Sequence, residues 1–266
     1  MTRLDPAAEA SRRGWSYVAD APAPTISGAV FGAISGGAVT GLVTAAGFEF
    51  GNLAGVVGGT RTEQFGSSTV TMNLATPIPV DYGFLSIRLP RPMPHVVVDA
   101  VANDGMRSSL PISIDAGQRV SLEGDFDTHF ALYAPDGYGR DARYLFTPDV
   151  MALLIDSTGD LDVELADDRL TVFSPTPWDL ADPAAWARVE QLVAVLGGKA
   201  VRQASRYRDE RAAPGEVVAT RARRLDQGIL SRRGVGVGAI VALMVALGLT
   251  AGWMVLLFSV LLTAGR

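Results

Sequence analysis

The sequence lacks cysteine, and lysine occurs once among its 266 residues, at Lys199. The absence of cysteine excludes disulfide bonds and thiolate chemistry, although it does not identify a compartment. Charge is missing from one long stretch, because no Asp, Glu, Lys or Arg occurs between Gly234 and Gly265. A hydrocarbon core about 30 Å thick needs roughly 20 apolar residues of helix. The run therefore predicts a C-terminal transmembrane helix.

The flanks of this run and the N-terminus set the expected topology. A buried core helix is the alternative interpretation, but a soluble helix seldom stays apolar on every face over so many turns. Residues 1–20 contain three arginines and no apolar segment directly after them, so they do not form a secretory signal. We expect a single-pass protein of the cell inner (plasma) membrane, with its N-terminal domain in the cytoplasm.

Charge is divided unevenly along the chain. Residues 1–198 hold 12 arginines against 24 acidic residues, for a net charge of −12, whereas residues 199–233 have a net charge of +6. An acidic domain is a poor nucleic-acid binder, so no nucleic-acid partner is expected. A basic block beside a span is typical of a cytoplasmic flank and of contact with anionic lipid. We assign that membrane-surface contact to Arg221, Arg223, Arg224, Arg232 and Arg233.

Strands are predicted for most of the middle of the chain. Alternating or apolar runs bounded by turn residues indicate strands at 38–45, 48–57, 84–89, 96–101, 119–123 and 130–133. The Pro90–Pro94 segment predicts a turn, because proline has no backbone N–H to donate to the hydrogen-bond ladder between strands. Thr147-Pro148-Asp149 predicts a helix start, with the helix continuing to Asp156.

A hairpin is predicted near the end of this region. Leu161–Leu165 alternates, Asp167-Asp168 suits a turn, and Leu170–Phe173 returns. Its polar positions, Asp160, Asp162 and Glu164, are predicted to face solvent.

The predicted fold class is α+β: a mixed, largely antiparallel sheet with a packed helix, then a long connecting helix and one C-terminal transmembrane helix. We divide the chain into an N-terminal helix and linker (1–24), an α+β cytoplasmic domain (25–177), a helical, basic juxtamembrane connector (178–233) and the transmembrane helix (234–266). The N-terminal helix is predicted over Pro6–Ala21. In the connector we predict one helix from Asp182 to Arg211, interrupted at Gly197-Gly198, and a second from Glu216 to Leu230. Residues 26–46 are Gly-rich and weakly apolar. We prefer strands there, and a second membrane segment stays open as the alternative.

Several stretches resemble one family when they are taken together. They are Ile87–Pro92, Leu122–Asp127 through Tyr133, Asp141–Met151, the hairpin after Asp160 and Gly198–Arg211. As a set they are similar to a family of uncharacterised actinobacterial membrane-anchored proteins. The resemblance implies a cytoplasmic domain with one C-terminal anchor. It implies no activity and brings no catalytic residue with it.

One cluster suggests metal chemistry. If the chain is extended at Asp125, Asp127 and His129, alternation places all three side chains on one face, and such a set can hold a divalent cation. A polar outer face with a turn is the simpler interpretation. His95 is expected to be a strand-edge residue with one hydrogen bond. The glycines at 234–238 lack the strand and the Lys-Ser/Thr of a phosphate loop, so no cofactor is expected.

The leading hypothesis is a membrane-tethered domain that binds an unidentified protein partner and is not an enzyme. The alternative is a metal-dependent hydrolase at the membrane surface that uses Asp125, Asp127 and His129. Gly248 and Gly252 form a Gly-x-x-x-Gly pair inside the apolar run, which allows close helix approach. A homodimer through the transmembrane helix is therefore a third hypothesis.

Overall fold

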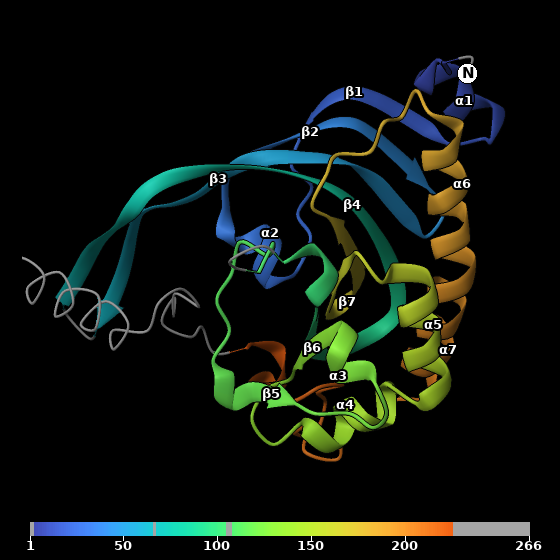
Figure 1. Cartoon of the computed structure of the whole chain (residues 1–266). Coiled ribbons are helices and arrows are strands. Elements are labelled where there is room, and N and C mark those ends of the chain that lie inside the picture. Colours follow the sequence, from blue (N-terminus) through green and yellow to red (C-terminus); the bar gives the residue numbers. More distant parts are fainter. Residues whose placement is uncertain (1–2, 66–67, 105–107, 226–266) are drawn as a thin grey trace, which may run out of the picture. The chain divides into compact units, whose positions relative to one another are not determined.

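An antiparallel sheet organises the part of the chain that the structure describes (Figure 1). The structure, a computed structural model, describes residues 3–65, 68–104 and 108–225, with the backbone alone for residues 59–76. Within these ranges the strand order is β1-β2-β3-β4-β6-β5, and β7 also pairs with β4. The strands are β1 (Ser16–Pro22), β2 (Ile34–Ala45), β3 (Phe48–Phe65), β4 (Ser68–Ala100), β5 (Arg119–Val120), β6 (Phe130–Tyr133) and β7 (Asp162–Ser174). The predicted α+β class with a largely antiparallel sheet is confirmed.

Helices and helical turns complete the described ranges. The α-helices are α1 (Pro6–Arg12), α2 (Ala29–Ala33), α3 (Phe126–His129), α4 (Gly139–Leu145), α5 (Pro148–Thr158), α6 (Pro183–Leu192) and α7 (Gly198–Arg206). A π-helical turn, η3 (Val193–Gly197), joins α6 to α7, and short 3-10 turns are η1 (Val101–Asn103), η2 (Ala116–Gln118) and η4 (Thr220–Arg223). In the described ranges no helix has the length and apolar character that a membrane crossing requires. The predicted span at 234–266 lies outside them.

The N-terminal region pairs as strands. β2 and β3 turn at Ala46-Gly47, where Gly47 has a φ of +91° that L side chains rarely adopt. The preferred interpretation is therefore confirmed for residues 34–45, while residues 29–33 form a short helix. An N-terminal helix continuing to Ala21 is wrong: α1 ends at Arg12, and residues 16–22 pair with β2.

The predicted turn at Pro90–Pro94 and the predicted hairpin are both wrong, for a shared reason. β4 continues through the prolines, and β7 continues through Asp167, so residues 83–98 of β4 pair with residues 163–174 of β7. The register shifts between Arg88 and Met93 and again before Val96, so the prolines fall where ladder bonds are interrupted. Asp167, opposite Met93, has a φ of +48°. The two strands bend together instead of ending.

β3 and β4 extend beyond the rest of the sheet as a two-stranded arm (Figure 1). We call residues 59–65 and 68–74 the β3–β4 arm. Its backbone pairs run from Gly59↔Leu74 to Phe65↔Ser68, and no other described strand pairs with these residues. Nearer the body, Val57 pairs with Ile78.

Both faces of the sheet are covered. On one face, α5, α6 and α7 close a core that includes Phe50, Leu85, Val98, Leu154 and Trp186. The other face carries a second cluster, Val30, Leu53, Phe84, Val97 and Phe173, beneath α2 and the segment around Leu110. Because each face is buried, polar residues on the second face are enclosed as well.

The C-terminal helices differ from the sequence prediction in their ends. The interruption predicted at Gly197-Gly198 is a π turn within a continuous helical segment, and α7 ends at Arg206 rather than at Arg211. A second basic helix from Glu216 to Leu230 is not formed in its described part, where helical geometry is limited to the 3-10 turn η4. The helix predicted to start at Pro148 is confirmed, because α5 begins there.

Candidate functional site

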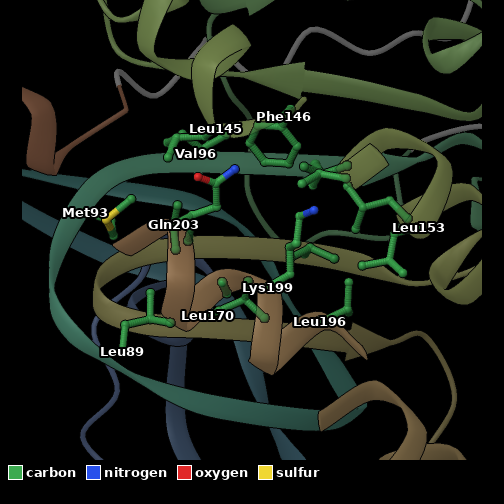
Figure 2. A pocket seen from close by; sticks show the side chains of 16 residues that line it. Leu89, Met93, Val96, Leu145, Phe146, Leu153, Leu170, Leu196, Lys199 and Gln203 are labelled. Atoms are coloured by element: carbon green, nitrogen blue, oxygen red, sulfur yellow. The ribbon is translucent and has the colours of Figure 1, made fainter. Parts of the chain in front are cut away.

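An apolar recess lies between the bent sheet and the helices α4, α5 and α7 (Figure 2). The recess is a cavity of about 60 Å³ that is partly open to solvent. The sheet provides Leu89, Met93, Val96, Val98, Val163, Leu165 and Leu170, α4 and its C-cap provide Leu145 and Phe146, and α5 provides Val150, Leu153 and Leu154. The bend of β4 and β7 therefore forms the concave wall of this recess. We call it the α5–α7 recess.

The helical wall of the recess also carries its polar groups. Leu196, Lys199, Ala200 and Gln203 recur at helical spacing and line the recess together. The π turn before them brings the helix close to β4, since a Cβ built on Gly197 would lie 3.3 Å from Cδ1 of Ile87. The Lys199 ammonium pairs with the Asp149 carboxylate of α5, so one ion pair connects the two helices at the mouth.

A second candidate lies on the opposite face of β4 and β7. Glu164 is 2% exposed, and its Oε1 lies 2.7 Å from Nε2 of His95, which is 4% exposed. The same carboxylate accepts the backbone N–H of Ala29 at 2.5 Å. Glu164 therefore accepts a hydrogen bond from a backbone N–H at the start of α2 and also holds the His95 side chain in place. His95 makes the expected side-chain hydrogen bond, but the expected strand-edge position is wrong, because His95 lies buried within β4.

Asp162 forms the neighbouring part of this buried polar face. Its Oδ1 accepts the backbone N–H of Ala100 at 2.8 Å, and its Oδ2 accepts the Ser109 hydroxyl at 2.6 Å. Burial raises the pKa of Asp162 above its ordinary value, against the effect of these hydrogen bonds. Burial, followed by the charge of Asp162, also raises the pKa of Tyr82 to about 12.

The prediction that this acidic face is solvated is therefore wrong for Asp162 and Glu164, which are 1% and 2% exposed. Alternation along the strand correctly separates the two faces, because Val97 pairs with Glu164 and Val98 with Val163. It cannot reveal that α2 and residues 108–114 cover the polar face. Of the predicted solvent-facing residues, Asp160 is on the surface and pairs with Arg188 at 2.5 Å.

The predicted metal residues are not brought together as the hypothesis required. Phe126–His129 is a short helix, so the chain is not extended there. Asp127 accepts the Ser121 hydroxyl at 2.5 Å and the Leu122 N–H at 3.2 Å, whereas His129 lies 3.7 Å from Asp125. Across the described residues, no group of three or more His, Cys, Asp or Glu side chains is arranged to hold a metal ion. The extended chain that the metal site assumed is therefore not observed at these residues.

A third polar cluster attaches the segment after α7 to the body. Asp209 has a side-chain exposure of 0%. Its Oδ2 accepts the Tyr138 hydroxyl at 2.7 Å and the Ala219 N–H at 2.9 Å, and its Oδ1 accepts two bonds from Arg211 at 3.0 Å. Burial alone would raise the pKa of this carboxyl, but the hydrogen bonds lower it to about 2. Asp209 is thus held ionised inside the protein.

Arg211 links this carboxylate to a second one. Its guanidinium lies 2.5 Å from Oδ1 of Asp141 and 3.8 Å from the centre of the Tyr138 ring. The Tyr207 hydroxyl donates to the same Asp141 oxygen at 3.0 Å. The hydrogen bond to Asp141 is the largest cause that raises the pKa of Arg211, and burial raises that of Tyr207. We call Tyr138, Asp141, Asp209 and Arg211 the Asp209 latch.

The latch makes residues 207–225 part of the folded body, and we call them the docked segment. Tyr207, Val218 and Ala222 are buried at 2%, 0% and 0% exposure. Of the five arginines assigned to membrane contact, Arg221, Arg223 and Arg224 lie exposed on this segment. Arg232 and Arg233, and the glycine pair Gly248 and Gly252, lie outside the described residues.

Comparison with known proteins gives little further information. No protein-family model matches the sequence. No curated protein matches it either. Among solved structures, the crystal structure of the mycobacterial trehalose monomycolate transport factor A, TtfA, is similar to this chain with a TM-score of 0.45 and 8% identity, over 73% of this chain and 91% of that chain. Its source is an actinobacterium, as is that of the family the sequence resembles. A likeness of this degree carries no argument about activity or partners.

Proposed function

We propose that this protein is a membrane-tethered cytoplasmic domain that holds a protein partner at the bilayer surface. The observation that carries the proposal is the docked segment. The Asp209 latch fixes the chain to the body as far as Leu225, and only the eight residues 226–233 precede the uncharged run. Eight residues reach at most roughly 30 Å. The body is thereby kept next to the membrane that the run enters.

The charge on the docked segment supports the same arrangement. Arg221, Arg223 and Arg224 are exposed on the docked segment. Each basic residue near an anionic leaflet contributes about 1 kcal/mol. Two of the three are also engaged within the body, since Arg223 lies 3.5 Å from Asp167 and the Arg221 guanidinium lies 5.9 Å from the centre of the Tyr138 ring. The leaflet is that of the inner (plasma) membrane, with the domain on its cytoplasmic side.

The β3–β4 arm supports the partner-binding part of the proposal. In the described ranges its strands pair only with each other. An isolated two-stranded hairpin is marginally stable in water. An arm of this length is therefore the segment that gains most from a protein partner, either along its strands or at a strand edge.

The test is affinity purification from native membranes under mild crosslinking. The full-length chain is compared with a variant in which Asn-Gly replaces residues 58–77. Val57 and Ile78, the residues on either side of the replaced segment, pair with each other, and Asn-Gly favours a two-residue hairpin turn between them. We expect a stoichiometric partner with the full-length chain and its loss with the variant, while membrane association is unchanged. If the full-length chain recovers no partner, the proposal is contradicted. If the full-length chain and the variant recover the same amount of partner, the β3–β4 arm is not the binding surface.

A further inference from the structure

We propose that the α5–α7 recess binds an unbranched fatty acid whose carboxylate pairs with Lys199. This site goes beyond the tethering role and does not depend on it. The walls of the recess are almost entirely apolar, which suits a hydrocarbon chain. A dry apolar slot of this kind gains affinity from a hydrocarbon tail.

The polar residues at the mouth of the recess determine which head group the ligand carries. Lys199 is the only lysine in the sequence, whereas every other basic position is arginine. Lys199 and Gln203 extend from one face of α7 over the apolar floor (Figure 2). An ammonium and an amide N–H₂ next to an apolar slot suit a single-chain ligand with an anionic head.

The ligand carboxylate replaces a weak contact rather than a strong one. Lys199 pairs with Asp149, and the two side chains are 27% and 60% exposed. Exposed ion pairs of this kind contribute little to stability, so exchanging one carboxylate for another costs little.

The single lysine provides a direct measurement. The full-length protein is reconstituted in phosphatidylcholine vesicles and treated with an amine-acylating reagent, and peptide mass spectrometry gives the acylation rate of Lys199 relative to that of the N-terminal amine. Acetate, hexanoate, decanoate and tetradecanoate are compared, with decanol as the uncharged control. At a decanoate concentration ten times its dissociation constant, the relative rate should fall about tenfold.

The dependence on chain length separates the recess from the bilayer. Affinity should rise about fourfold for each methylene group that the recess buries, and it should stop rising once the recess is full. Acetate and decanol should protect Lys199 weakly. Protection by acetate as strong as that by decanoate, equal protection by decanol, or a continuous rise with chain length would each overturn the proposal.

Two variants on the recess and one matched control complete the test. Ala200→Phe fills the recess and should abolish protection, whereas Val201→Phe, at the neighbouring exposed position of α7, should leave it intact. Asp149→Asn leaves the packing unchanged and frees Lys199, so decanoate should bind it more tightly than it binds the unaltered protein. Unchanged protection in Ala200→Phe, or weaker binding in Asp149→Asn, would contradict the assignment.

Discussion

Asp209 shows how one carboxylate fixes the position of a whole segment. Its two oxygens accept bonds from Tyr138, Ala219 and Arg211, in a position that water does not reach. Removing such an acceptor leaves several buried donors without a partner, which costs more than the hydrogen bonds contribute on balance. The Asp209 latch is therefore the residue-scale basis for treating residues 207–225 as part of the body.

The pH dependence of stability tests this assignment. The pKa of Asp209 is lowered from 3.8 to about 2 in the folded protein, so its stabilising effect is present above pH 4 and disappears as the pH falls towards 2. The linked free energy is about 2 kcal/mol. In urea unfolding of residues 1–225, Asp209→Asn should be less stable at pH 7, and the difference should shrink as the pH falls to 2. Glu210→Gln, at the exposed neighbouring position, should have the same stability as the unaltered protein at each pH. If the stability of Asp209→Asn also matched that of the unaltered protein at each pH, the assignment would be refuted.

Individual residues also show which features could not be predicted from the sequence. The alternation around Val163 correctly placed Asp162 and Glu164 on one face, but the covering of that face comes from Ala29 and Ser109, which are distant in the sequence. The metal hypothesis assumed an extended chain at Asp125, Asp127 and His129, whereas Phe126–His129 is helical, so residues two apart there do not share a face. The recess was missed for a similar reason: its lining comes from separate elements, and no local pattern reports their convergence.

At the scale of elements, the bend shared by β4 and β7 positions the recess. The segments on either side of the bend were predicted as strands from their sequences. Their continuity was not predicted, because the proline-rich segment has the composition of a turn. Proline is tolerated here because the ladder is interrupted between Arg88 and Val96. By contrast, the strands predicted at 38–45 and 48–57 depend on local pattern and glycine chemistry and are confirmed, although β2 begins at Ile34 and β3 continues to Phe65.

Asp167 offers a test of the bend. Its φ of +48° is unfavourable for most L residues, and Asn or Gly adopts such a value at lower cost. Asp167→Val should destabilise residues 1–225 by about 1–2 kcal/mol relative to Asp167→Asn in urea unfolding. Asp167→Gly controls for the lost contact with Arg223, and it should remain close to Asp167→Asn. Equal stability of the Val and Asn variants would mean that the bend does not require this conformation.

At the scale of the whole molecule, the fold includes the basic segment before the apolar run. A helical, basic connector was predicted there from the sequence. In the described part, Tyr207, Val218 and Ala222 instead pack into the body. Tertiary contacts outweigh helix propensity in this segment.

Truncation tests this organisation. A chain that ends at Arg206 exposes the surface under Tyr207 and Val218 and leaves Tyr138 and Asp141 without Arg211. We expect its Tm to fall by about 10 °C or more relative to a chain that ends at Leu225, since losing one buried large side chain costs about 1.5–3 kcal/mol and each kcal/mol shifts Tm by about 2–4 °C. Differential scanning fluorimetry of the two fragments measures this, and matching Tm values would show that the docked segment adds no stability.

The most direct test of the tethered-domain account is flotation with lipid. Full-length protein and residues 1–225 are each expressed in cells, the membranes are separated on a density gradient without detergent, and the floating fraction is washed with high salt and with carbonate. The account predicts that the full-length chain floats and resists both washes, because a spanning helix does not depend on surface charge. Residues 1–225 should be released by salt. Full-length protein that stays in the aqueous fraction without detergent would contradict the account.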